Sequence, residues 1–191
     1  MTDGPSPELP RLSATRALAF YGVLLGVALG WGALRGDVNV FVYERLDAEP
    51  RPDLLLRVGL GLGVGLFFVL MTRLAARFSW SKRLGAEFRK LLGELTLRDV
   101  TILAITSAVG EEALFRGAMQ PEFGFLWTSL IFGLLHMGPG KAFWPWTLWA
   151  LLCGFALGWL GDYTGDLLAP TLAHFTVNYF NLWQISQGEL G

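Results

Sequence analysis

Six apolar stretches, separated by polar connections, are the feature that most restricts what this chain can fold into. An α-helix needs about 20 apolar residues to cross the hydrocarbon core of a bilayer, and a segment much shorter than that does not cross it unaided. The pattern predicts an all-α, polytopic membrane helix bundle with about six transmembrane helices. The expected spans are 17–34, 54–76, 99–119, 123–137, 145–161 and 167–186, of which 123–137 is short.

The composition agrees with a chain that lies in a lipid bilayer. Charged residues make up 16% of the 191 residues, against roughly 25% in soluble domains, and the mean hydropathy is +0.46. No basic stripe of the kind that binds nucleic acid is present, so we expect no nucleic-acid partner.

Residues 80–95 differ from the apolar stretches because their leucines and Phe88 recur at helical spacing between basic residues. This pattern is typical of one amphipathic interfacial helix lying on the membrane surface. Residues 1–16 are expected to form a polar N-terminal tail. Residues 17–191 are expected to form a single transmembrane domain, with a motif-bearing core at 95–185.

The distribution of Lys and Arg predicts the orientation of the bundle. Residues 72–98 carry seven basic side chains, whereas residues 35–53 carry three basic and five acidic ones. Because basic loops stay in the cytoplasm, 72–98 is expected inside and 35–53 outside. Six spans then place both termini in the cytoplasm, and we expect an integral protein of a bacterial inner membrane.

Ionisable groups within apolar segments are rare and usually face the interior of a bundle. Here they are Glu111, Glu112, Arg116, His136 and His174. Each histidine alone could be a satisfied core residue. The chain has only two histidines, however, and both lie in apolar segments of a chain that also offers a buried carboxylate, which favours one shared site.

Helix geometry separates the two adjacent glutamates. Glu112 and Arg116 are four residues apart, with the acid first, so they can pair on one helix face. Glu111 points about 100° away from Glu112. We therefore predict that Glu112 and Arg116 support the structure and that Glu111 is free for chemistry. The alternative is one structural network of all three groups.

Two further pairs have the same four-residue spacing. His174 and Asn178 can face one cavity, and the ring of Phe132 can hold the imidazole of His136. A carboxylate can deprotonate a water molecule, a histidine can position it, and imidazole and amide groups can donate to a developing oxyanion. These residue types therefore favour a hydrolytic site.

Three motifs occur in order: EEALFR at 111–116 fits EExxxR, FGLLH at 132–136 fits FxxxH, and HFTVN at 174–178 fits HxxxN. In order, spacing and apolar context they resemble the CAAX protease and bacteriocin-processing (CPBP, Rce1-like) family of intramembrane proteases. The resemblance covers about residues 95–185. It implies a helical bundle with a site inside the membrane, in which a glutamate activates water without an acyl-enzyme.

Carried onto this chain, the resemblance makes Glu111 the general base, and His136 a group that holds the water or the intermediate. His174 and Asn178 would form the oxyanion site, with Glu112 and Arg116 supporting the local structure. No cofactor is expected. The alternative is a zinc ion held by Glu111, His136 and His174, although the sequence has no H-E-x-x-H motif.

The expected function is hydrolysis of a peptide bond in a membrane-anchored or lipid-modified protein, near its C-terminus or close to the membrane. The alternatives are myxosortase-like processing of C-terminal sorting signals of exported proteins, a non-catalytic scaffold or immunity protein, and a transporter or channel. His136 can reach the depth of Glu111 only if 123–137 is short or re-entrant. The sequence does not decide which membrane face feeds the site, and the charge distribution leans slightly toward the outside.

Overall fold

The computed structural model describes residues 14–37, 39–42 and 51–188 of the chain. The predicted polar tail lies almost entirely outside the described residues, as does part of the 35–53 connection. The described residues confirm the all-α class, with a single isolated bridge between Val42 and Asp166. The elements are α1 (Ala14–Arg35), α2 (Leu54–Ala75), α3 (Ser79–Leu92), α4 (Leu97–Glu112), the π-helix η1 (Ala113–Met119), α5 (Gln120–Leu135), the 3-10 turn η2 (Lys141–Phe143), α6 (Trp144–Thr164) and α7 (Leu168–Gln187).

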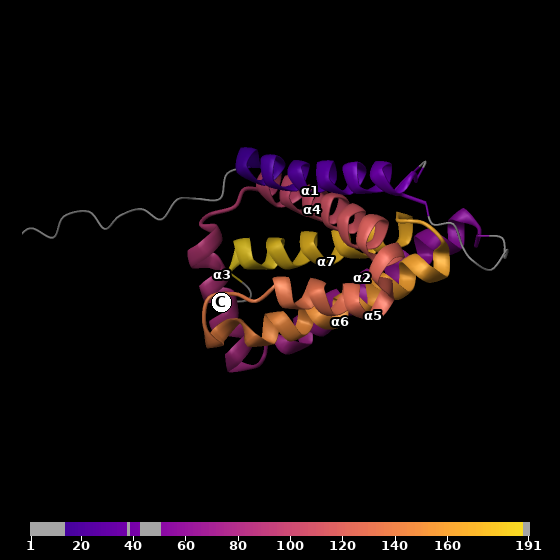
Figure 1. Ribbon diagram of the computed structural model, residues 1–191. Coiled ribbons are helices and arrows are strands. Elements are labelled where there is room, and N and C mark those ends of the chain that lie inside the picture. The colour runs from indigo at the N-terminus through magenta and orange to yellow at the C-terminus, as the bar shows by residue number, and fades with distance from the viewer. Residues whose placement is uncertain (1–13, 38, 43–50, 189–191) are drawn as a thin grey trace, which may run out of the picture.

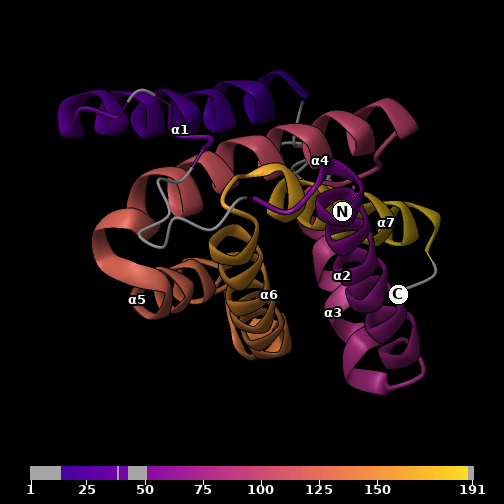
Figure 2. The same ribbon diagram turned by 90° about the vertical axis from the view of Figure 1, so that its right-hand side faces the viewer.

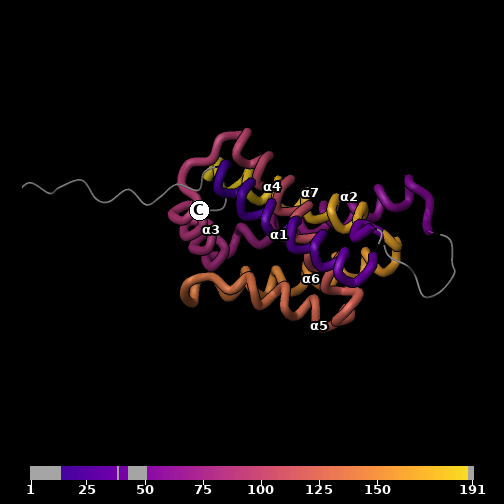
Figure 3. Tube along the Cα trace, turned by 45° about the horizontal axis from the view of Figure 1, so that its top comes forward, coloured from indigo at the N-terminus to yellow at the C-terminus, as the bar shows by residue number. Residues whose placement is uncertain are grey.

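The helix α7 runs through the middle of the bundle and packs against α2, α4 and α6. The helix α1 covers the outer side of α4, and α5 lies against α6 (Figures 1 and 2). The helix α3 crosses one end of the bundle, near the start of α4 and the end of α7 (Figure 3). The helix α4 contacts α7, and η1 contacts α5, so the helices that carry the three sequence motifs touch one another.

Three of the six expected spans are long and apolar enough to cross a membrane, by length and composition. They are Ala14–Arg35, Leu54–Ala75 and Lys141–Thr164. The other three expected spans are helical but fall short of that standard. The helices α4 and α5 have 16 residues each, and α7 has 20 residues but carries polar side chains along its length.

A break at Gly124 explains why α5 is short. Gly124 has φ 77° and ψ 164°, a backbone conformation that favours glycine. The chain turns back there, so that α5 runs beside α6 (Figure 1). The helical turns after the break, residues 125–135, rise about 16 Å, roughly half the thickness of the hydrocarbon core. The sequence predicts that the fourth helix must be short for His136 to reach the level of Glu111, and α5 is short.

Two glycines let α2 approach α7 closely. A Cβ atom at Gly61 would lie 2.7 Å from the Ala169 carbonyl oxygen, and one at Gly65 would lie 2.7 Å from Thr176 Cβ. Positions 22, 26, 30, 59 and 63 have open space around them in the described part of the chain.

The predicted amphipathic helix is α3. Its basic side chains Lys82 and Arg83 are exposed, while Ser81 and Gly85 are buried against the bundle. Phe88 makes edge-to-face contacts with Phe143 and Trp146, at ring-centroid distances of 5.3 and 4.9 Å. A capping box between Thr96 and Asp99 then starts α4. The amphipathic pattern therefore corresponds to an element that closes one end of the bundle.

Candidate active site

The EExxxR motif lies where α4 changes into a π-helix. Glu111 and Glu112 end α4, and Arg116 lies in the π segment Ala113–Met119. Glu112 and Arg116 are fully buried and Glu111 is 8% exposed. Short π segments within helices occur often at functional sites, because they change the direction in which side chains point.

Glu112 and Arg116 form the ion pair that their spacing predicted. Arg116 Nη1 donates to Glu112 Oε1 over 3.0 Å, and Nη2 donates to the Gly154 carbonyl oxygen of α6 over 3.0 Å. The guanidinium also lies 4.3 Å from the centroid of the Phe132 ring, which is within the range of a cation–π contact. Three groups, one each from α4, α6 and α5, thus surround this buried charge.

His174 joins the two glutamates, a connection that helical spacing did not predict. Its Nδ1 lies 2.6 Å from Glu112 Oε1, and its Nε2 lies 3.9 Å from Glu111 Oε2. Because a carboxylate only accepts, we assign a proton to Nδ1, which leaves Nε2 facing Glu111. Glu112 therefore fixes the ring of His174 and not only the charge of Arg116.

His136 approaches Glu111 from the end of α5. Its Nδ1 lies 2.7 Å from the Phe132 carbonyl oxygen, so Nδ1 carries the proton and Nε2 of the neutral ring is an acceptor. That Nε2 lies 3.6 Å from Glu111 Oε2. The Phe132 ring lies 4.4 Å from the imidazole, as its four-residue spacing indicated.

Glu111 Oε2 has no hydrogen-bond partner among the described residues, although it is buried. It faces the Nε2 atoms of both histidines. Two acceptors, Glu111 Oε2 and His136 Nε2, cannot bond to each other without a proton between them. A water molecule that donates one hydrogen to each would satisfy both groups.

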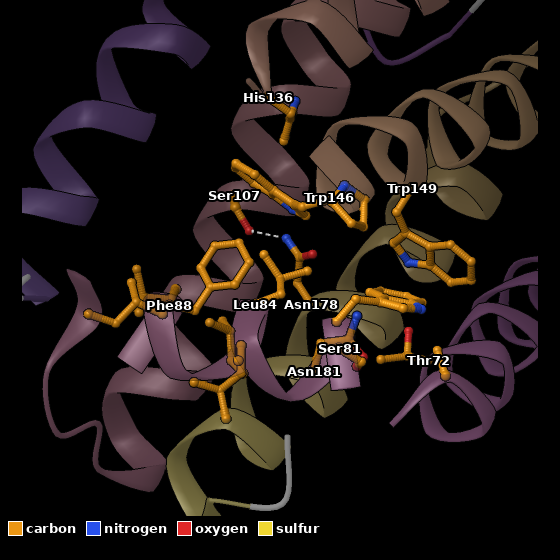
Figure 4. A pocket seen from close by; sticks show the side chains of 18 of the residues that line it. Thr72, Ser81, Leu84, Phe88, Ser107, His136, Trp146, Trp149, Asn178 and Asn181 are labelled. Atoms are coloured by element: carbon orange, nitrogen blue, oxygen red, sulfur yellow. Dashed lines mark hydrogen bonds between the residues drawn. The ribbon is translucent and has the colours of Figure 1, made fainter. Parts of the chain in front are cut away.

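Asn178 is held by a residue that the sequence analysis did not single out. Its Nδ2 donates to Ser107 Oγ over 2.9 Å, as Figure 4 shows. Ser107 lies one turn before Glu111 on α4. The sequence could have pointed to Ser107, because its hydroxyl lies on the same helix face as Glu111. Its bond to Asn178 could not be predicted, since the two residues are 71 positions apart.

A cavity of about 330 Å³ connects Glu111 to the amphipathic helix α3. Figure 4 shows His136, Ser107, Asn178 and the aromatic side chains around it. A smaller cavity of about 80 Å³ adjoins it on the side of His174. The two cavities share His136, Trp146, Trp149, Asn178 and Asn181. All four predicted catalytic side chains therefore line connected space.

The zinc alternative can be compared with these distances. Two ligands of one tetrahedral zinc ion lie about 3.3 Å apart, whereas Glu111 Oε2 lies 3.6 and 3.9 Å from the two Nε2 atoms. Over residues 14–37, 39–42 and 51–188, no group of three or more His, Cys, Asp or Glu side chains is arranged to hold a metal ion. The observed distances lie between the spacing of two zinc ligands and the roughly 4.4 Å between two hydrogen-bond partners of one water molecule, so the spacing does not separate a shared ion from a bridging water.

The fold and the site define a helical, membrane-type protein in which a carboxylate and two imidazoles meet inside the bundle. Residues 93–180 match the family described as type II CAAX prenyl endopeptidase Rce1-like. The chain is also 34% identical over 97 residues to the uncharacterized protein YpbD of Bacillus subtilis (strain 168). The match covers 49% of each chain, so it spans about half the length of that curated relative. No solved structure matches the chain.

Proposed function

We propose that this protein is an intramembrane endopeptidase that hydrolyses a peptide bond by glutamate-activated water. The single observation that carries the proposal is the unpaired, buried Glu111 Oε2, which faces the Nε2 atoms of His136 and His174. A buried carboxylate oxygen without a partner is costly. A catalytic water in the cavity beside it would offset that cost.

In the proposed reaction, Glu111 removes one proton from the water. His136 Nε2 accepts a hydrogen bond from the second hydrogen, which stays on the water oxygen. The water oxygen attacks the carbonyl carbon of the peptide bond, and the carbonyl oxygen becomes an oxyanion. Glu111 then gives its proton to the leaving amine nitrogen as the carbon–nitrogen bond breaks. The products are a carboxylic acid and an amine, with no covalent enzyme intermediate.

His174 and Asn178 are the proposed oxyanion donors. Asn178 Nδ2 has two hydrogens, of which one goes to Ser107, so the second is available to a ligand. In its imidazolium form, His174 can donate from Nε2 to the oxyanion while Nδ1 still donates to Glu112. Donors fixed in this way before the substrate arrives stabilise charge that develops in the transition state.

Unpaired polar atoms suggest how a peptide would lie in the cavity. Trp149 Nε1 is a buried donor and Asn181 Oδ1 a buried acceptor, and neither has a partner in the described residues. Both side chains line both cavities. A peptide main chain offers one acceptor and one donor per residue, which matches this pair. This pair of unpaired atoms supports a peptide as the substrate class.

The proposed orientation keeps six membrane-embedded helices, both termini in the cytoplasm and α3 at the cytoplasmic surface. The cavity extends from Glu111 to α3, within the connection that carries the seven basic residues. The positive-inside rule then opens the site toward the cytoplasm. This favours a membrane-anchored or lipid-modified substrate with a cytoplasmic C-terminal region over the sorting signal of an exported protein.

The proposal is tested with purified protein in lipid nanodiscs and two quenched reporters. One is a peptide with a farnesylated cysteine near its C-terminus, and the other carries a single apolar helix as its anchor. We expect cleavage of at least one reporter, products whose summed mass exceeds the reporter by one water, and no loss with a chelator. Absence of cleavage of both reporters would contradict the proposed function. Chelator-sensitive cleavage would contradict the metal-free mechanism.

A further inference from the structure

Tyr21 differs from its neighbours on α1. Most of that helix is exposed at the rim of the bundle, with Phe20 at 59% and Val23 at 63% exposed. Tyr21 instead is half-buried and lines the cavity beside Glu111. The helix α1 lies outside residues 93–180, the range that matches the protease family.

Close contact between α1 and α4 sets the position of Tyr21. A Cβ atom at Gly110 would lie 2.8 Å from the Tyr21 carbonyl oxygen and 3.2 Å from its Cβ. A side chain at position 110 would therefore push α1 outward. Gly110 directly precedes Glu111, so this close contact lies beside the candidate base, and Figure 2 shows α1 running alongside α4.

The Tyr21 side chain reaches the carboxylate across this contact. Both residues line the same cavity, and the phenol of Tyr21 interacts with the Glu111 carboxylate. Glu111 Oε2 makes no hydrogen bond within the described residues and faces the two histidines. Oε1 is therefore the carboxylate oxygen that is available to the phenol.

We propose that Tyr21 is a positioning residue for Glu111, which holds Oε1 so that Oε2 points at the catalytic water. This inference rests on the proposed function of Glu111. Without the phenol, the carboxylate can rotate about its terminal bond and present either oxygen to the histidines. The tyrosine does not touch the reacting atoms, and it adds a contact from α1 to a site otherwise built from the motif helices.

The test compares Tyr21→Phe with Tyr163→Phe, which removes the same hydroxyl at a position 44% exposed on α6 and outside both cavities. A hydrogen bond to a charged group is worth about a tenfold to hundredfold change in rate. We expect Tyr21→Phe to lower kcat on the cleaved reporter by that factor with KM unchanged. Tyr163→Phe should keep both constants.

A second measurement needs no turnover. In protein with isotope-labelled glutamate, the infrared carboxyl band of Glu111 is the band that disappears in Glu111→Gln. We expect this band to shift in Tyr21→Phe and to stay in place in Tyr163→Phe. An unchanged band, or an unchanged kcat, would overturn the role of Tyr21. If the unaltered chain cleaves neither reporter, the proposed function fails, and the infrared band alone decides whether Tyr21 holds Glu111.

Discussion

Glu112 lies at the centre of the polar cluster because its Oε1 atom accepts from both Arg116 and His174. Helical spacing predicted the first bond, since the two residues are four apart on one helix. The second bond joins residues 62 positions apart, so no local pattern could have predicted it. The same holds for Asn178 and Ser107. Roles could be predicted from residue types, but the contacts between helices depend on packing.

Replacing Glu112 by Gln is expected to destabilise the fold. Arg116 would remain buried without a matching negative charge, and breaking such a pair costs about 3–5 kcal/mol. The melting temperature of the purified protein should fall by roughly 6–12 °C for a loss of about 3 kcal/mol. The exposed Glu94→Gln should melt like the unaltered protein. Equal melting temperatures for both variants would contradict the supporting role of Glu112.

Two backbone features of the helices place His136 beside Glu111. The π segment Ala113–Met119 begins directly after the glutamates, and Gly124 turns the chain back toward them. The sequence predicted the short helix after residue 123 from the depth of its histidine. It did not predict the π segment. Over seven residues, the spacing of apolar side chains does not distinguish a π-helix from an α-helix.

Close packing of α2 on α7 can be tested at two neighbouring glycines. A Cβ atom at Gly65 would meet Thr176 Cβ at 2.7 Å, whereas nothing lies within 4 Å of one at Gly63. Alanine favours a helix over glycine by about 1 kcal/mol. Gly63→Ala should therefore leave the melting temperature equal or higher, and Gly65→Ala should lower it. The same shift in both variants would contradict the packing of α2 on α7.

The molecule as a whole combines an apolar exterior with a polar interior at one level of the bundle. The exterior follows from composition, which predicted six apolar spans, and three of them are long and apolar enough to cross a membrane. The helices α4 and α5 are shorter than the long apolar helices, and α7 carries polar side chains that include His174 and Asn178 of the site. The number of helices that cross the bilayer therefore stays a prediction.

Cysteine labelling tests the orientation of the molecule in the membrane. The single cysteine of the chain, Cys153, is buried, so an added cysteine can be detected with a membrane-impermeant maleimide. We expect Lys90→Cys on α3 to react only in inside-out vesicles, and Tyr163→Cys at the other end to react only in right-side-out vesicles. The reverse pattern would place the cavity toward the outside and contradict a cytoplasmic substrate.

The most direct test of the proposed chemistry is the turnover of Glu111→Gln in lipid nanodiscs, on the reporter that the unaltered protein cleaves. Gln keeps the size of the side chain but cannot accept the proton of the water, so we expect kcat to fall by a factor of about 100 or more. The melting temperature should stay close to that of the unaltered protein, and Glu94→Gln should retain full activity. Turnover of Glu111→Gln within a few-fold of the unaltered protein would contradict the assignment of Glu111 as the general base.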